Sequence, residues 1–373
     1  MNDSPIKVLQ VFSSLNMGGA ESRMMDVYRH LDTTKIQFDF VTLSDEKQFF
    51  EDEIENLGGS VYKLHSPRKV GVYQHIKELR ECMHKNSYSA VHAHTSYHCG
   101  IVMLAAWLEH VPVRIAHART TGSKSTSKAK SISIVSGRWL IRLFSTHRLA
   151  ISKKAGEFVF GNSQFEVLPN AIDVNKYQNT TEKEIDTLKR KLNISGSEYV
   201  IGQIGRFDPM KNHTFTVNWF SEFIKESPES KLILVGDGQL RENIARQAQQ
   251  LGVDQNVVFT GVRSDVPELI HCFDVLFFPS VFEGLGGVVI EAQAAGVPVV
   301  MSDAIPTETD MNLGLIQRIS LKSDLSDWTS AVIDSRSIIR PTFECINRNF
   351  EENKYTLSAE ISRLSEIYRG VSS

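Results

Sequence analysis

Short apolar runs alternate with amphipathic segments along almost the whole chain of 373 residues. Short runs rich in Val, Ile and Phe are typical of buried parallel strands. In the first half of the chain they predict strands at residues 6–12, 36–43, 60–64, 90–93, 113–116, 148–151 and 165–168. Segments with apolar residues at helical spacing lie between these runs, one of them at residues 46–57, so the pattern predicts an α/β fold with parallel sheets.

The alternation starts again after a polar interval. Strands are predicted at 199–204, 231–235, 257–260, 274–278 and 297–301, and helices at about 212–225, 239–251, 265–272, 288–295, 325–333, 343–349 and 356–369. Residues 169–173 form the predicted hinge, because Pro169 cannot continue a central strand and Asn170 tolerates turn geometry. We therefore expect two domains, residues 1–172 and 173–354, which suits the length of the chain.

The composition is that of an ordinary globular protein, with 41% apolar and 23% charged residues. The net charge of −3 indicates no particular partner. The four cysteines are scattered, which favours a reducing compartment over a disulfide framework. The first residues lead directly into a strand, and no apolar run reaches 18 residues, so we expect neither a signal peptide nor a membrane-spanning helix. These features predict a cytoplasmic protein.

The charges are unevenly distributed. Residues 110–156 contain no acidic residue but ten basic ones: Arg114, Arg119, Lys124, Lys128, Lys130, Arg138, Arg142, Arg148, Lys153 and Lys154. Apolar residues at 139–141 and 143–144 lie among them. Such a segment suits an anionic membrane surface or a polyphosphate ligand, and a solvated basic face is the alternative. No nucleic-acid-binding motif accompanies the charge, so we expect no nucleic acid partner.

A glycine-rich stretch follows the predicted strand 274–278. Gly284, Gly286 and Gly287 allow a ligand close to the backbone, and the helix expected from about residue 288 begins with free N–H groups that suit phosphate. Glu283 and Glu291 flank this loop. Carboxylates beside a phosphate position predict a ligand with both phosphates and hydroxyls, such as a sugar nucleotide. An ordinary βα turn is the alternative.

The spacing of Glu283 and Glu291 argues against a hydrolase. If both residues were helical, eight residues would separate them by about 12 Å along the helix axis. The paired carboxylates of a glycosidase lie about 5 to 9.5 Å apart. We therefore expect the two acids to contact different parts of one extended ligand, one the sugar hydroxyls and the other the ribose hydroxyls.

Two cations follow the first strand of the second domain. Arg206 and Lys211 lie in the sequence GRFDPMK, at the carboxyl end of the strand predicted at 199–204. Ligands of parallel sheets bind at this edge, so both side chains are expected to reach a diphosphate and to stabilise its charge as it leaves. A salt-bridged Arg and a Lys at a helix start are the alternative. The glycines at 18–19 and at 236 and 238 lack the third glycine of a dinucleotide fingerprint and predict tight βα turns.

Several histidines lie at predicted strand ends. His92 and His94 share one face of a strand, but no acidic residue lies nearby in sequence, so polar lining of a cleft is favoured over a zinc site. His117 also ends a strand and is expected either to hydrogen-bond a sugar or to be a satisfied core histidine. The chain contains no D-x-D triplet. We therefore expect no metal and no cofactor, with the charge of a diphosphate neutralised by Arg206, Lys211 and the helix dipole.

Taken together, these motifs resemble glycosyltransferase family 4, whose members have the two-domain GT-B fold. The resemblance is carried by FTGVRSDVPELIHCFDVLFFPSVFEGLGGVVIEAQAAGVPVV (259–300), GRFDPMKN (205–212), VGDGQLRENI (235–244), LPNAID (168–173), MGGAE (17–21) and VHAHT (91–95). It extends over essentially the whole chain and is densest from 199 to 303. Bacterial members of exopolysaccharide and capsule synthesis are the most similar. One departure is Ala171, where the family usually has glycine.

The resemblance implies a retaining, metal-independent transfer of a hexose or N-acetylhexosamine from a nucleotide-diphosphate sugar, expected to be a UDP-sugar. It implies that Arg206 and Lys211 clamp the diphosphate, that Glu283 contacts the donor sugar and Glu291 the ribose, and that His117 lies in the catalytic cleft. The further donor-binding positions that it implies are Gly18, Gly19, Gly205, Arg263, Gly284, Leu285 and Gly286. The final helix, within 355–373, is expected to cross back to the N-terminal domain.

The implied acceptor is a saccharide, expected to be linked to polyprenyl diphosphate at the inner face of the plasma membrane. The N-terminal domain would bind this acceptor, and segment 110–156 would contact the membrane. Two other functions remain open at this point. One is a UDP-sugar 2-epimerase, which shares the fold, and the other is a non-catalytic subunit that binds a nucleotide sugar.

Overall fold

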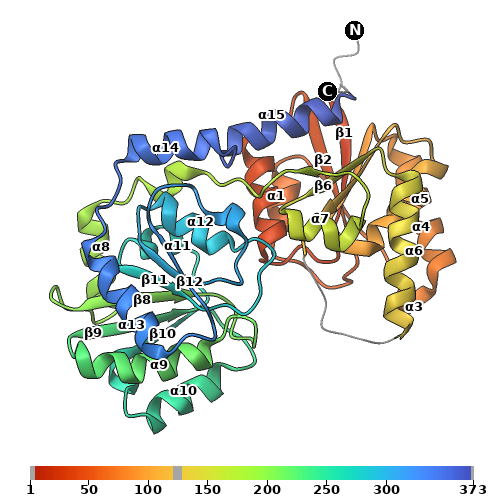
Figure 1. The fold of residues 1–373 in the computed structure, drawn as a ribbon. Helices are drawn as coiled ribbons and strands as arrows, with labels where there is room; N and C mark the ends of the chain where they lie inside the picture. The colour runs from red at the N-terminus through yellow and green to blue at the C-terminus, as the bar shows by residue number, and fades with distance from the viewer. Residues whose placement is uncertain (1–4, 121–127, 371–373) are drawn as a thin grey trace. The chain divides into compact units, whose positions relative to one another are not determined.

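The computed structural model describes residues 5–120 and 128–370, without the side chains of 128–132. The predicted contribution of Lys124, Lys128 and Lys130 to the basic segment therefore lies outside the described side chains. The chain divides into two compact units (Figure 1). The first unit comprises Met1–Ile172 and Lys354–Ser373, and the second comprises Asp173–Asn353. Among the described residues, no helix has the length and apolar character needed to cross a membrane.

The first unit is built on a parallel sheet of seven strands in the order β3-β2-β1-β4-β5-β6-β7. The strands are β1 (Ile6–Val11), β2 (Ile36–Thr42), β3 (Val61–Lys63), β4 (Ala90–Ala93), β5 (Val113–Ala118), β6 (His147–Ala150) and β7 (Glu166–Val167). The helices are α1 (Gly19–His30), α2 (Glu51–Asn56), α3 (Pro67–Val70), α4 (Val72–Asn86), α5 (Cys99–Leu108), α6 (Lys128–Phe144), α7 (Lys153–Phe160) and α15 (Leu357–Tyr368).

The last helix completes the core of the first unit. Figure 1 shows α15, in dark blue, beside α1, in red. Leu364, Ile367 and Tyr368 are buried in one cluster with side chains of α1, β2 and β5. Arg363 also donates two hydrogen bonds, of 2.8 and 2.9 Å, to the carboxylate of Glu166 in β7. The apolar spacing of residues 357–368 therefore predicts this helix correctly, and its buried face belongs to the sheet of the first unit.

The second unit repeats this architecture with six parallel strands in the order β10-β9-β8-β11-β12-β13. They are β8 (Tyr199–Ile204), β9 (Ser230–Val235), β10 (Val257–Gly261), β11 (Val275–Phe278), β12 (Val299–Ser302) and β13 (Ile316–Ile319). The helices are α8 (Glu182–Lys191), α9 (His213–Glu226), α10 (Arg241–Gln250), α11 (Val266–Ile270), α12 (Gly287–Ala294), α13 (Leu325–Asp334) and α14 (Phe343–Glu352). Figure 1 shows α9, α10 and α13 on one side of this sheet, and α11 and α12 on the other.

Each sheet has one point where the direction of its strand order reverses. In the first unit β1 lies between β2 and β4, and in the second unit β8 lies between β9 and β11. Loops leaving neighbouring strands at such a point diverge to opposite faces of the sheet and leave a crevice at the carboxyl edge. The loops after β1 and β8 carry Gly18–Gly19 and Arg206–Lys211 respectively. The topology therefore places both predicted ligand-binding loops where an α/β sheet binds its ligand.

The prediction of two parallel α/β units is confirmed, but some elements differ. Strand β13 was not predicted, because its residues are only half-buried and follow a loop without clear periodicity. Helix α2 begins at Glu51, five residues later than the expected helical segment at 46–57. The reason is local: the backbone N–H of Gln48 donates to the Glu51 carboxylate, and its side chain bonds the loop after β1.

Candidate functional site

The strand ends at β8 and β11 bring together two of the predicted site residues. Lys211 Nζ lies 2.7 Å from Glu283 Oε1, and both side chains are largely buried. The ammonium also lies 4.7 Å from the centre of the Phe278 ring, at the end of β11. A carboxylate and an aromatic face thus hold the cation in one position. Arg206 is exposed at the end of β8.

Gly205 leaves room for the Lys211 stem in this arrangement. A Cβ atom at Gly205 would lie 3.0 Å from two carbons of the Lys211 stem. Gly236, at φ +129°, is in turn packed so closely that a Cβ atom would lie 2.2 Å from the Gly205 carbonyl oxygen. The predicted tight turn at 236–238 is confirmed, and it supports the backbone on which Arg206 and Lys211 are carried.

The loop that carries Lys211 is fixed by polar side chains. Asp208 Oδ1 accepts hydrogen bonds from the backbone N–H groups of Met210 and Lys211, at 2.8 and 3.2 Å. From inside the sheet, Gln203 Nε2 donates to the Lys211 carbonyl at 2.7 Å. Sequence reasoning did not single out Gln203. The available signal was an amide in a strand of otherwise apolar residues, where a buried polar group requires a partner.

The glycine-rich loop joins β11 to α12. Gly286 is the N-cap of α12 at φ 91°, a left-handed conformation that favours glycine, and Leu285 is buried beneath it. The N–H of Val281 donates to the Met210 carbonyl at 2.8 Å, so this loop and the Lys211 loop are joined. Glu291 lies within α12, whereas Glu283 precedes the helix. The 12 Å separation, which was calculated for the case that both acids are helical, therefore does not apply to this pair.

Arg263 follows β10 and has an acidic partner of its own. Its Nε donates to Asp265 Oδ1 at 2.8 Å, and a second contact joins Nη2 to Oδ2. The guanidinium lowers the pKa of the Asp265 carboxyl.

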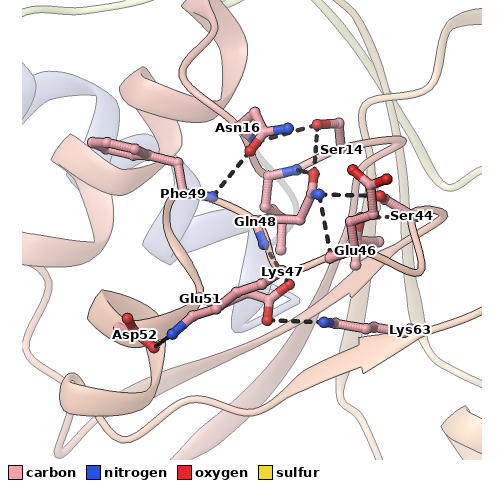
Figure 2. A network of polar contacts seen from close by, with 12 residues as sticks. Ser14, Asn16, Ser44, Glu46, Lys47, Gln48, Phe49, Glu51, Asp52 and Lys63 are labelled. Atoms are coloured by element: carbon pink, nitrogen blue, oxygen red, sulfur yellow. Dashed lines mark hydrogen bonds and ion pairs between the residues drawn. The ribbon is translucent and has the colours of Figure 1, made fainter.

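In the first unit, Gln48 holds the start of the loop that leads to Gly18 and Gly19, and Figure 2 shows its contacts with Ser14 and Ser44. Gln48 Oε1 accepts hydrogen bonds from Ser14 Oγ at 2.8 Å and from the Leu15 N–H at 3.2 Å. Its Nε2 donates to Ser44 Oγ at 3.0 Å. The loop therefore has a defined conformation, and Gly18 caps α1 with extended backbone. Sequence reasoning missed Gln48, because it was expected to be an ordinary helical residue.

The predicted histidines meet in the interior of the first unit. His92 and His117 are fully buried, and His94 is 9% exposed. His92 Nε2 lies 3.0 Å from His117 Nδ1, and His92 Nδ1 lies 2.8 Å from the hydroxyl of Tyr368. His117 Nε2 has no hydrogen bond within normal geometry to any described residue. The prediction that His92 lines a cleft is wrong for this reason: its ring is enclosed by the sheet and α15.

A second row of contacts continues from this cluster to Arg119, directly after β5. His94 Nε2 lies 2.9 Å from Gln10 Oε1, and Arg119 Nε donates to His94 Nδ1 at 3.0 Å. Gln10 Nε2 donates to the Tyr368 hydroxyl at 3.1 Å. These partners come from β1, from α15 and from the residues that directly follow β4 and β5, so no local pattern in the sequence could have indicated them.

Burial controls the charges of this cluster. It lowers the pKa of His92, His94 and His117 well below the usual range, and the charge of Arg119 lowers these values further. The three imidazoles are therefore neutral near pH 7. Burial also raises the pKa of Glu360, in α15, to about 7, although Arg119 opposes this shift. Glu360 Oε2 accepts the backbone N–H of Ala171 at 3.0 Å.

Basic and apolar side chains gather on helix α6. Val135, Trp139 and Leu143 are 65%, 59% and 52% exposed and follow one another at intervals of four residues, which places them on one helix face. A surface cavity beside this face is lined by Arg138, Trp139, Arg142, Arg148, Phe160, Gly161, Asn162, Ser163 and Gln164. An exposed apolar row next to arginines is unusual on a soluble protein surface.

Known proteins resemble this chain over its full length. The family model described as "Glycosyl transferases group 1" matches residues 184–319, and "Glycosyltransferase Family 4" matches residues 17–176. EpsF of Bacillus subtilis, named as a glycosyltransferase, is 34% identical over 99% of this chain and 97% of its own. An Escherichia coli enzyme named UDP-Gal:alpha-D-GlcNAc-diphosphoundecaprenol alpha-1,3-galactosyltransferase is 25% identical over 72% of each chain.

The fold also matches solved structures. The crystal structure of HepE from Anabaena in complex with UDP superposes with a TM-score of 0.79, at 19% identity, and covers 98% of this chain and 100% of HepE. The two parallel sheets thus have the GT-B architecture, as the sequence predicted. With two family models spanning both units and a full-length relative at 34% identity, the chain belongs to glycosyltransferase family 4.

Proposed function

We propose that this glycosyltransferase moves a hexose or N-acetylhexosamine from a UDP-sugar to a saccharide linked to polyprenyl diphosphate, with retention of the anomeric configuration, in exopolysaccharide or capsule synthesis. Two similarities to known proteins support the assignment of these substrates. The Escherichia coli relative is named for a UDP-sugar donor and a diphosphoundecaprenol-linked acceptor, and HepE was crystallised with UDP. The similarity to EpsF over nearly the full length supports the assignment to a glycosyltransferase of this group.

The pairing of Lys211 with Glu283 is the observation that carries the donor assignment. One cation and one carboxylate lie 2.7 Å apart at the carboxyl edge of β8 and β11, next to the first turn of α12. Lys211, Arg206 and the α12 N–H groups suit the two phosphates. Glu283 suits the sugar hydroxyls and Glu291 the ribose, with backbone N–H groups from Gly284 to Gly286 between them.

The proposed reaction needs one bond exchange and one proton transfer. The bond between the sugar C1 and the β-phosphate oxygen breaks, and its electron pair stays on the departing UDP. The acceptor hydroxyl forms the new C1–O bond on the same face of the sugar and gives its proton to a β-phosphate oxygen. Arg206 and Lys211 stabilise the charge that develops on UDP, which lowers the barrier. In this scheme no metal ion is needed, and His117 contacts the donor sugar.

Helix α6 is the proposed membrane contact of the first unit. Its row of Val135, Trp139 and Leu143 would enter the interface of an anionic bilayer, while the exposed Arg142 contacts lipid phosphates. This would place the enzyme at the inner face of the plasma membrane, where a polyprenyl-linked acceptor is embedded. In liposome flotation, Trp139→Ala should reduce binding to anionic vesicles at low salt. Absence of wild-type binding to these vesicles would refute the membrane contact.

A transfer screen tests the function as a whole. Purified protein is incubated with UDP-glucose, UDP-galactose, UDP-N-acetylglucosamine or GDP-mannose, with and without polyprenyl-diphosphate-linked N-acetylglucosamine. We expect UDP release that depends on the acceptor, in the presence of EDTA, and an α-linked product by NMR. If the C2 epimer of the UDP-sugar forms without acceptor, the protein is an epimerase and not a transferase. Binding without turnover for every donor and acceptor would indicate a non-catalytic subunit.

A further inference from the structure

The buried polar side chains of the first unit form one continuous hydrogen-bonded series. We call it the histidine relay, and its members in order are Arg119, His94, Gln10, Tyr368, His92 and His117. Each successive pair is joined by a contact of 2.8 to 3.1 Å. The members come from four elements, β1, β4, β5 and α15, and from the residues that directly follow β4 and β5.

Arg119 sets the direction of the first half of the relay. A guanidinium can only donate, so His94 Nδ1 must accept the hydrogen bond from Arg119 Nε. The proton of neutral His94 then lies on Nε2 and is donated to Gln10 Oε1. This contact fixes the orientation of the Gln10 amide, whose Nε2 donates to the Tyr368 oxygen.

The direction continues to His117. Because the Tyr368 oxygen already accepts from Gln10, its own proton finds its acceptor in His92 Nδ1. His92 therefore carries its proton on Nε2 and donates it to His117 Nδ1. The proton of His117 is left on Nε2. With the opposite direction after Tyr368, the buried hydroxyl proton would have no acceptor in the relay, which is costly in a dry interior.

A further observation supports this assignment. Burial holds the pKa of the three imidazoles well below the usual range, so each ring carries a single proton. The single proton of each ring can therefore be placed by the direction of its hydrogen bonds.

We propose that Arg119, Gln10 and Tyr368 are positioning residues that hold His117 as the Nε2–H tautomer, so that its buried nitrogen without a described hydrogen-bond partner is a donor. The inference rests on the proposed function, in which His117 contacts the donor sugar. A sugar oxygen that accepts a hydrogen bond suits this nitrogen, whereas a hydroxyl that must donate does not. The tautomer is set by Tyr368 of α15, a residue that lies 276 positions from His92 along the chain.

A metal site is the competing explanation for three clustered histidines. Potential ligand atoms of His92, His94 and His117 lie within 4.8 Å of one another. The relay argues against a metal site, because the lone pairs on Nδ1 of His92 and on Nδ1 of His94 already accept hydrogen bonds. The donor-only guanidinium on His94 also adds a positive charge where a cation would bind.

Histidine tautomers can be read directly by NMR. The full chain is labelled with 15N-histidine, two-bond correlations identify the protonated ring nitrogen, and the His117 signal is assigned by its loss in His117→Gln. We expect wild-type His117 to be a single Nε2–H tautomer. Tyr368→Phe should give a mixture of both tautomers and lower kcat/KM for UDP-glucose about twofold if the mixture is equal. Arg119→Lys, which is still donor-only, should keep the Nε2–H tautomer.

Tyr28→Phe is the matched control. The Tyr28 hydroxyl lies in the same core but donates to a backbone carbonyl and to no member of the relay. Its loss should therefore leave the tautomer of His117 unchanged. The relay is refuted if wild-type His117 carries its proton on Nδ1, or if Tyr368→Phe keeps a single Nε2–H tautomer. A shift of all three histidine signals with one equivalent of Zn²⁺ would also refute it. Inactivity with every donor would overturn the proposed function but leave the tautomer result intact.

Discussion

Replacement of Lys211 by alanine should separate catalysis from stability. In the proposed reaction the ammonium stabilises charge on the departing diphosphate. Removal of one such preorganised group typically lowers kcat by about 10²–10³-fold, or about 3–4 kcal/mol. We therefore expect Lys211→Ala to reduce UDP release by this factor, with a smaller change in KM, because the interaction strengthens as the charge develops.

The same substitution also removes a partly buried ion pair, and the structure gives its approximate cost. Lys211 and Glu283 have 18% and 14% of their side-chain surface exposed and lie 2.7 Å apart. A charge-assisted hydrogen bond of this kind contributes about 1.5–3 kcal/mol. In a unit of this size each kcal/mol corresponds to about 2–4 °C in Tm, so we expect a loss of about 3–12 °C.

Lys231→Ala is a control with nearly the same cost. Lys231 and Glu198 lie 3.2 Å apart, are 14% and 18% exposed, and lie in the same unit, at the opposite end of the strands. Both variants should lose similar Tm in differential scanning fluorimetry, but only Lys211→Ala should lose kcat. Equal activities of the two variants would refute the role of Lys211. A double-mutant cycle with Glu283→Gln should be non-additive, because both residues act on one ligand.

Three further substitutions test the packing beside Lys211 and the buried carboxylate of Glu360, and a fourth is a control. Gly205→Ala places a Cβ atom 3.0 Å from the Lys211 stem, so we expect about tenfold lower kcat/KM with nearly unchanged Tm, and wild-type kinetics would contradict this. Gly236→Ala should cost about 3 kcal/mol or more in urea unfolding, because its Cβ atom would lie 2.2 Å from the Gly205 oxygen at a positive φ. Gly196→Ala, with open space around it, should change stability by less than about 0.5 kcal/mol. Burial raises the folded-state pKa of Glu360 from 4.5 to about 7, so between these pH values the native state binds more protons than the unfolded state. As the pH rises through this window, the carboxyl group lowers the free energy of unfolding by at most about 3 kcal/mol. Glu360→Gln should therefore show a smaller fall in Tm between pH 5 and pH 8 than the wild type, and an equal fall would show that Glu360 is not the responsible group.

Local patterns in the sequence were sufficient for the architecture. Apolar runs separated by helical periodicity predicted two parallel α/β units, since both signals depend on residues that are close together in the chain. The same is true of the glycine-rich turns, where the φ of 91° at Gly286 is a property of one residue. Strand β13 escaped prediction because its half-buried residues carry neither signal.

Residue chemistry at strand ends also predicted part of the candidate site. Arg206, Lys211 and Glu283 were identified from their places after β8 and β11, and the structure joins Lys211 to Glu283. The ion pair itself could not be predicted, because it connects residues 72 positions apart whose contact depends on the pairing of two strands. The supporting contact from Gln203 to the Lys211 carbonyl is local by comparison, because it joins β8 to the loop that follows it.

Only the tertiary structure decided the environment of the histidines. The sequence placed His92, His94 and His117 at strand ends, where exposure to a ligand and burial in a core were both consistent with the pattern. Helix α15 returns from the end of the chain to cover this sheet, and Tyr368 supplies the hydroxyl that joins Gln10 to His92. Burial removes the charge of an imidazole and its partners select the tautomer. Both depend on atoms brought together from four elements, which no local segment of the sequence can specify.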